Sequence, residues 1–221
     1  MNERTPASAI EARWPVVLAI LALLVLLVAL PDRIRLVPMW VHCGIVGVFL
    51  MPIVAVGLTA GRAPWPRIER TTTFAFVVVV AMATSVNLGY LLGEMLVRSD
   101  GVSGMQLLTS SIGLWATNVV NFSVLYWQVD GGGPEARRSP AGRFPDWLFP
   151  QAGVPEQVPV GWRPKFVDYL FLGFCTSTAF SPTEAIPLTS RAKLLMMVQS
   201  TFSLVTIVAV AARAISILGN T

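Results

Sequence analysis

The segment from residue 166 to residue 213 constrains the fold most. An apolar stretch from Phe166 to Cys175 is followed by a polar break that extends to Glu184, and a long apolar run comes after it. Hydrocarbon offers no hydrogen bonds to backbone groups, so a break at membrane depth must be sheltered by protein or by a water-filled cavity. The order therefore predicts a re-entrant half crossing followed by a full crossing.

Composition indicates a membrane protein, because 54% of the residues are apolar and only 13% are charged. A helix needs about 20 apolar residues to cross roughly 30 Å of hydrocarbon. The runs that approach or exceed this length are Trp14 to Leu30, Met39 to Ala60, Phe74 to Val97, Met105 to Trp127 and Leu194 to Ala212. We therefore predict an all-α integral membrane helical bundle with five transmembrane helices and a short re-entrant, pore-type helix.

The first run follows Arg13, as a secretory signal would, but Leu30-Pro31-Asp32 lacks a small-residue cleavage pattern. We expect it to be a retained anchor.

The stretch from 128 to 165 differs from the rest in being rich in Gly and Pro. It begins with Gly131-Gly132-Gly133-Pro134 and continues with Pro140, Pro145, Pro150, Pro155, Pro159 and Pro164. Because closely spaced prolines oppose a helix, we predict an extended extramembrane linker. Within it, Trp147-Leu148-Phe149 either lies against the membrane interface or covers the helix ends. The predicted domains are 1–127 with four transmembrane helices, the 128–165 linker, and 166–221 with the re-entrant helix-loop and the final crossing.

Orientation follows from the basic residues near the helix ends. If residues 166–180 form a re-entrant hairpin, twelve of the 16 Lys and Arg residues share a side with the amino terminus and the linker. This distribution predicts a cytoplasmic amino terminus and a cytoplasmic 128–165 linker. If 166–180 crosses fully, the carboxyl terminus joins the amino terminus inside.

Several function classes are disfavoured by residues that are scarce or placed inside apolar runs. The net charge of +4 comes from arginines at helix ends, so no nucleic-acid partner is predicted. Cys43 and Cys175 lie in apolar runs and are expected to be small buried hydrophobes rather than disulfide partners. No catalytic motif is present, and one histidine, His42, cannot form a histidine-rich metal site. We expect no enzyme activity, no metal and no cofactor.

Intramembrane polar residues are candidates for function or for packing. Asn87 and Glu94 occur in the third helix, and Glu94 precedes Arg98 by one turn, so it forms either an ion pair or a cation or proton site. Asn118 and Asn121 share a face of the fourth helix and serve either as interhelical hydrogen-bonding groups or as the lining of a hydrated path.

Two helix faces carry spacing signals. Ser85, Gly89 and Gly93 recur at steps of four and predict close approach of another helix. Gln199, Ser203 and Thr206, with Arg213 beyond them, form a polar stripe on the final helix, which must face a bundle interior, a symmetry axis or water. We predict that Gln199, Ser203 and Thr206 lie along the ion path.

The polar break admits two interpretations. Thr176, Thr178, Ser181 and Glu184 can act as loop ligands for an ion that has lost its hydration shell. Alternatively, Ser181 caps a helix start that Glu184 completes as a capping box. The two interpretations are compatible, because the cap can end a re-entrant loop. Further on, Thr189 or Ser190 is the expected cap of the final helix.

The last part of the chain resembles the two-helix pore module of potassium channels, over roughly residues 106–217. The residues that carry the likeness are Tyr169, Thr176-Ser177-Thr178, Ala179-Phe180-Ser181-Pro182, Glu184 and Pro187-Leu188-Thr189, followed by a long helix. The resemblance implies a short pore helix, a filter-like loop and an inner helix. Phe180, Ser181 and Pro182 stand where that family has its filter glycines, and the channel loop enters from outside.

The whole chain also resembles an uncharacterised group of bacterial multi-pass membrane proteins. Its likeness is carried by Asp130-Gly-Gly-Gly-Pro-Glu-Ala-Arg137, Phe149-Pro-Gln151 and Thr178-Ala-Phe-Ser-Pro-Thr183. This resemblance implies an α-helical fold in a bacterial cytoplasmic membrane.

These observations predict a multi-pass cell-membrane protein with a pore-loop-like segment, of the cation-channel type and homo-oligomeric. Its expected partners are the lipid bilayer and a small cation. Two alternatives stay open: a secondary transporter that uses the broken helix as its binding site, and a non-conducting assembly partner that interacts through its linker.

Overall fold

The computed structural model describes residues 13–28, 39–58, 65–97, 104–138, 143–154, 156–178 and 185–219. The helices are α1 (Trp14–Val28), α2 (Met39–Leu58), α3 (Trp65–Val97), α4 (Gly104–Val129), α5 (Pro150–Gly153), α6 (Phe166–Thr178) and α7 (Ser190–Gly219). Two short 3-10 helices, Asp130–Gly132 and Ala136–Arg138, follow α4. Strands β1 (Trp147–Leu148) and β2 (Ile186–Pro187) pair antiparallel, with Trp147 opposite Pro187. The described chain is therefore all-α apart from one very short strand pair.

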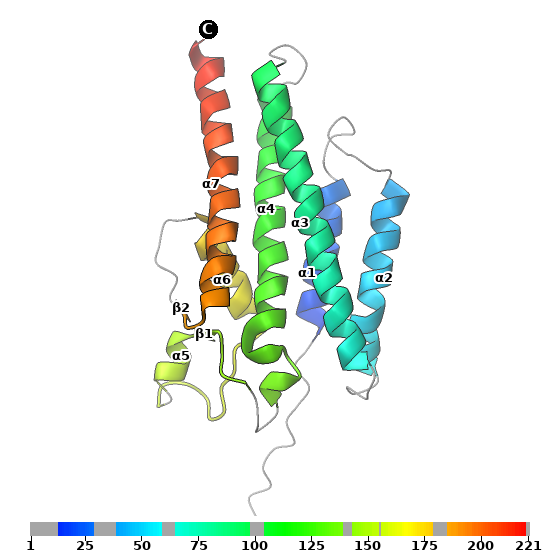
Figure 1. Cartoon of the computed structure of the whole chain (residues 1–221), viewed down its shortest axis with the longest axis vertical. Coiled ribbons are helices and arrows are strands. Elements are labelled where there is room, and N and C mark those ends of the chain that lie inside the picture. The colour runs from blue at the N-terminus through cyan, green and yellow to red at the C-terminus, as the bar shows by residue number, and fades with distance from the viewer. Residues whose placement is uncertain are drawn as a thin grey trace, which may run out of the picture.

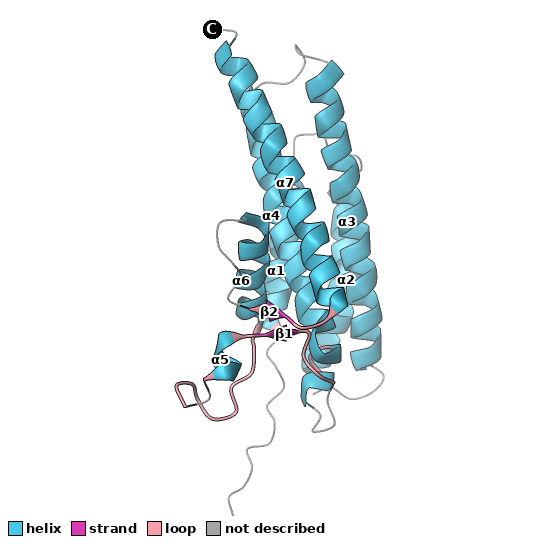
Figure 2. Ribbon diagram, turned by 60° about the vertical axis from the view of Figure 1, so that its left-hand side comes forward, coloured by secondary structure: helices cyan, strands magenta, loops and turns pink. Residues whose placement is uncertain are grey.

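The long helices form a bundle in which α4 is the central member. It contacts α1, α3, α6 and α7, while α2 packs on α1 and α3 (Figure 1). The shorter α6 lies beside α4 and α7 along only part of their length, and β1, β2 and α5 gather at the end where α6 begins (Figure 2). This arrangement places the 128–165 segment at one end of the bundle.

Helix boundaries extend beyond the apolar runs at several points. α3 begins at Trp65 rather than Phe74, because Pro66 suits a first helical turn and the hydroxyls of Thr71 and Thr72 bond back to the carbonyls of Arg67 and Ile68. α7 begins at Ser190, where the Thr189 hydroxyl accepts a hydrogen bond from the backbone N–H of Ala192 at 3.2 Å. The predicted cap of the final helix is thus confirmed as Thr189.

The prediction of an extended linker is wrong at three short helical segments among its described residues. Asp130–Gly132 and Ala136–Arg138 are 3-10 helices, and α5 is a single turn that starts at Pro150, where a missing N–H costs nothing. Trp147 and Phe149 are 1% and 6% exposed, so this segment packs as a cover on the helix ends.

The bundle combines an apolar core with many buried polar side chains and many exposed apolar ones. Its interior contains many polar side chains: Thr84, Asn87, Ser111, Thr117, Asn118, Asn121, Ser123, Gln199, Ser203 and Thr206. Its surface carries large apolar ones: Leu18, Val25, Val48, Met51, Val78, Met82, Val86, Ile112, Leu194, Met197, Leu204 and Val208. Exposed apolar area of this extent is unusual in soluble monomers.

By length and composition, two helical segments of the described chain are apolar enough to cross a membrane. They are Arg67–Gly93 within α3 and Ser190–Ala211 within α7. Shorter apolar helical segments cover Trp14–Leu26 and Val46–Val56. The bundle is therefore an all-helical one with two candidate spans, and five crossings remain a prediction.

Close helix approach occurs at Gly173 of α6. A Cβ atom there would lie 2.4 Å from the Ser123 Oγ and 3.1 Å from the Val119 carbonyl oxygen of α4. The sequence predicted close approach on the Ser85, Gly89 and Gly93 face instead. A Cβ at either of those two glycines would meet no described atom within 4 Å, so no described helix of this chain approaches that face.

We expect Gly173→Val to lower the thermal stability of the purified protein in detergent by about 1–3 kcal/mol, because α6 must move away from α4. The matched control is Gly89→Ala, where a methyl group enters open space and a helical residue gains propensity. Equal melting temperatures for Gly173→Val and the wild type would contradict the close α4–α6 packing.

Candidate functional site

The end of α6 is the feature on which the candidate site depends. With 13 residues, α6 is about 20 Å long, whereas the 30 residues of α7 span about 45 Å. The Ser200 hydroxyl of α7 donates to the carbonyl of Thr176 at 3.1 Å, so α6 ends level with the middle of the Ser190–Ala211 segment. The chain is next described at Ala185, which lines a small hollow with Leu172 and Cys175. It has therefore returned alongside α6.

Gln199 fastens this helix end to the bundle. Its Nε2 donates to the Gly173 carbonyl at 2.8 Å and to the Ser177 Oγ at 2.7 Å, and its Oε1 accepts from the Tyr126 hydroxyl. The side chain is 0% exposed, and all three partners are buried. One amide thus joins α4, α6 and α7.

Asn118 extends the same buried cluster toward the other end of α7. Its Nδ2 donates to the Ser203 Oγ at 2.8 Å and to the Gln199 carbonyl at 3.3 Å. Thr206 is also buried, but its hydroxyl donates to the Phe202 carbonyl of its own helix at 2.9 Å. The predicted polar stripe therefore faces the bundle interior, and its first two members bind neighbouring helices.

The three hydroxyl residues at the end of α6 have different surroundings. Thr176 is buried and donates to the Leu172 carbonyl, and Ser177 accepts from Gln199. Thr178 is half-buried and continues the exposed face of Val167, Phe171 and Phe174. Only Thr178 of these three reaches the outer face of α6.

Some predicted site residues are separate from this cluster or lie outside the described part of the chain. Asn121 donates from Nδ2 to the Val77 carbonyl at 3.2 Å, and Asn87 is buried on α3. The Oδ1 atoms of both residues are buried without a hydrogen-bond partner among the described residues. Ser181 and Glu184, and the side chains of Glu94 and Arg213, lie outside the described residues.

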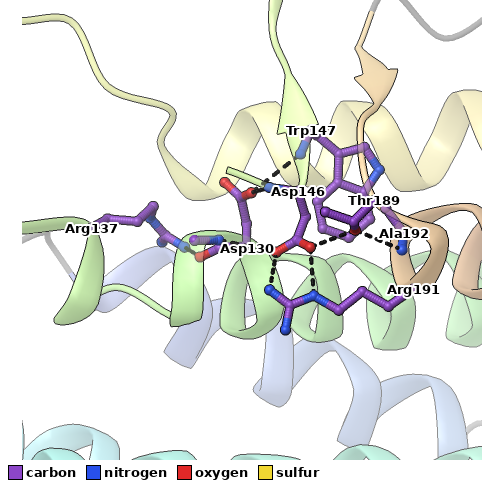
Figure 3. A network of polar contacts seen from close by, with 8 residues as sticks. Asp130, Arg137, Asp146, Trp147, Thr189, Arg191 and Ala192 are labelled. Atoms are coloured by element: carbon purple, nitrogen blue, oxygen red, sulfur yellow. Dashed lines mark hydrogen bonds and ion pairs between the residues drawn. The ribbon is translucent and has the colours of Figure 1, made fainter. Parts of the chain in front are cut away.

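A second polar cluster, centred on Asp146, closes the end of the bundle where α6 begins (Figure 3). Arg191 donates from Nε and Nη2 to the two carboxylate oxygens of Asp146, each at 2.5 Å. The Thr189 hydroxyl donates to Oδ1 at 2.6 Å, and the Gly131 N–H donates to Oδ2 at 3.2 Å. Asp146 thereby ties the linker to the start of α7.

Asp130 continues this cluster toward α6. Its Oδ1 accepts from the backbone N–H of Asp146 at 2.7 Å, and its Oδ2 accepts from the Tyr169 hydroxyl at 2.7 Å. The Arg137 guanidinium donates to the Trp127 and Asp130 carbonyls and lies 5.2 Å from the centre of the Tyr169 ring. The linker is therefore bonded to α4, α6 and α7 at once.

Asp146 has a pKa below its ordinary value. Burial alone raises this pKa, but the hydrogen bonds from Arg191 and Thr189, the positive charge of Arg191 and the Gly131 N–H together lower it by more. The ionised carboxylate is therefore the form that the folded protein stabilises.

A third polar cluster joins α1, α3 and the linker. Arg13 binds the Glu69 carboxylate at 3.4 Å and the Glu135 carboxylate at 2.8 Å, and the Arg13 and Glu69 side chains are 4% and 1% exposed. Sequence reasoning missed this cluster and the Asp130 and Asp146 carboxylates. The available signal was the occurrence of Asp130, Glu135 and Asp146 in a segment predicted to be an extended extramembrane linker.

No family model matches the chain, and no curated protein or solved structure matches it significantly. Both resemblances drawn from the sequence therefore stay predictions.

We expect Asp146→Asn to lower stability at neutral pH by about 1–3 kcal/mol, because Arg191 loses a charged partner. Since folding depresses this pKa, the stabilisation is present above the unfolded value of about 4 and is lost as pH falls through the lower folded value. Melting temperature measured in detergent from pH 7 to pH 3 should fall less steeply in Asp146→Asn than in the wild type. The control is Glu156→Gln, which removes an exposed carboxylate of the linker. If the melting temperatures of the wild type and Asp146→Asn fall equally between pH 7 and pH 3, the ionised Asp146 is not the stabilising group.

Proposed function

We propose that this chain is a multi-pass membrane protein in which α6 and the return to Ala185 form a re-entrant unit that binds and conducts a small cation. Two positions of the chain carry the proposal. Helix α6 ends at Thr178, level with the middle of α7, and Ala185 again lies beside α6.

Membrane placement is supported by the exposed apolar side chains of the bundle and by its buried polar ones. Apolar side chains on its outside match lipid tails, and polar side chains inside form interhelical hydrogen bonds that lipid could not supply. The candidate spans in α3 and α7 agree with the same placement. The proposed location is the bacterial cell membrane, with five crossings besides the re-entrant α6.

Cation binding is supported by the direction of α6. The carboxyl end of a helix carries partial negative charge on its unpaired carbonyls, and half helices that end at membrane depth aim this charge at cations. Hydroxyl groups of Thr176 and Thr178 occur in the same turn, and Gln199 holds that turn in place. In this proposal Gln199 positions α6, Ser203 binds Asn118 of α4, and Thr178 faces the ion.

The proposed path runs between copies of the chain rather than through one. The space between α4, α6 and α7 is filled by buried side chains, including Tyr126 and Gln199. Thr178 lies on the outer face of α6, where a neighbouring subunit can complete a path. This reasoning agrees with the homo-oligomer predicted from the sequence.

The re-entrant arrangement can be tested with single cysteines in a background that lacks Cys43 and Cys175. Val160→Cys and Leu188→Cys flank α6 and are exposed, so a membrane-impermeant thiol reagent should label both from the same side of sealed vesicles. If α6 crosses fully, the two positions will label from opposite sides.

Conduction can be tested by cation flux into proteoliposomes. We expect Thr178→Val to change the flux by about tenfold, because the substitution removes a hydroxyl at the end of the half helix. Thr201→Val is the matched control, since the hydroxyls of Thr178 and Thr201 both donate to their own helix backbone but Thr201 is exposed on α7. Wild-type flux no higher than in protein-free vesicles would eliminate conduction, and equal effects of the two substitutions would eliminate the role of Thr178.

A further inference from the structure

Two hollows lie side by side where α3 and α4 meet the linker. The first, which we call the polar cavity, has a volume of about 190 Å³ and is lined by Arg67, Arg70, Gln128, Gly133 and Glu135, among others. It has both cationic and anionic side chains on its wall. Arg67 and Arg70 are exposed, so their guanidinium groups are accessible to a ligand.

Gln128, in the wall of the polar cavity, has a side-chain acceptor without a hydrogen-bond donor among the described residues. The residue is 2% exposed, and its Oε1 has no hydrogen-bond partner among the described residues. A buried acceptor of this kind loses its hydration without compensation unless a donor occupies the cavity. The cavity therefore fits a ligand that presents N–H or O–H groups.

The second hollow, which we call the apolar groove, has a volume of about 380 Å³ and runs between α3, α4 and α7. Its wall includes Phe74, Leu125, Val129, Leu195 and Val198, together with Arg191, whose guanidinium binds Asp146. Val198 is 59% exposed, so the groove is open toward the outer surface of the bundle. Such a groove accommodates a hydrocarbon chain.

The two hollows join at one turn of α3. Arg70 lines the polar cavity and Phe74, four residues later, lines the apolar groove. The Arg70 guanidinium lies 5.7 Å from the centre of the Phe74 ring. On α4, Gln128 belongs to the cavity and Val129 to the groove. Together the hollows form a site with a polar end and an apolar end.

We propose that this site binds a phospholipid with a phosphoethanolamine head group, its phosphate on Arg67 and Arg70 and one acyl chain in the apolar groove. The ammonium supplies three N–H donors, one for the Gln128 Oε1 and another for the Glu135 carboxylate. Glu69 and Glu135 both bind Arg13, and a zwitterionic head group adds one charge of each sign to a wall that already carries both. The proposal rests on the membrane location proposed above and is independent of conduction.

Native mass spectrometry of the full-length protein in detergent can test this inference. Phosphatidylethanolamine, phosphatidylcholine and phosphatidylglycerol with identical acyl chains are added in turn. Phosphatidylcholine has no N–H donor, so it should bind about tenfold more weakly than phosphatidylethanolamine. Equal binding of all three lipids, or preference for phosphatidylglycerol, overturns the proposal.

Matched variants assign the binding to the two hollows. Arg70→Gln should weaken phosphatidylethanolamine binding about tenfold, whereas Arg143→Gln removes an exposed linker arginine and should not. Val198→Trp fills the groove and should weaken lipid binding. Leu204→Trp adds the same side chain at an exposed position of α7 outside the groove and should not. Gln128→Leu should abolish the preference for phosphatidylethanolamine over phosphatidylcholine. Equal binding by Arg70→Gln and Arg143→Gln refutes the site even if Gln128→Leu does not fold.

Discussion

The buried amide of Gln199 is the interaction on which the arrangement of α6 depends. A helix that stops inside a bundle leaves its last carbonyls without intrahelical partners, and these groups need donors where water is scarce. Ser200 donates to one of these end carbonyls, that of Thr176, while Gln199 donates to the Gly173 carbonyl one turn earlier and to the Ser177 Oγ. The end of α6 is thus held in place by hydrogen bonds from α7.

The base of α6 is held by different chemistry. There Asp130 accepts from Tyr169 of α6, and Asp146 binds Arg191 of α7, so two buried carboxylates of the linker hold α6 and the start of α7. Charged groups suit this end, since it lies where the proposed crossings leave the membrane. Neutral amides and hydroxyls suit the tip, where an unpaired charge would cost far more. The two clusters therefore follow the expected gradient of polarity with depth.

The sequence predicted the helices well and the tertiary contacts poorly. Apolar runs located α1, α2, α3, α4 and α7 to within a few residues in most cases, and Thr189 was expected as a cap because its hydroxyl acts on the next turn. The sequence did not predict the close contact between α6 and α4 at Gly173, since a single glycine indicates such a contact only when the neighbouring helix is known. The linker was predicted to be extended because of its prolines, and its packing gave no local signal, since Asp146 and Arg191 are 45 positions apart.

Composition and periodicity by themselves determined that this chain is all-helical, that its α6 is too short to match α7, and that polar residues line one stripe of the last helix. These properties are local, since they depend on which residues lie within a few turns of one another. Only the tertiary structure decided which groups satisfy that stripe, that the linker is a packed cover, and that a polar cavity adjoins an apolar groove at Arg70 and Phe74. Those features arise between segments distant in the chain, and a hydrogen bond or a cavity exists only once both of its sides are in place.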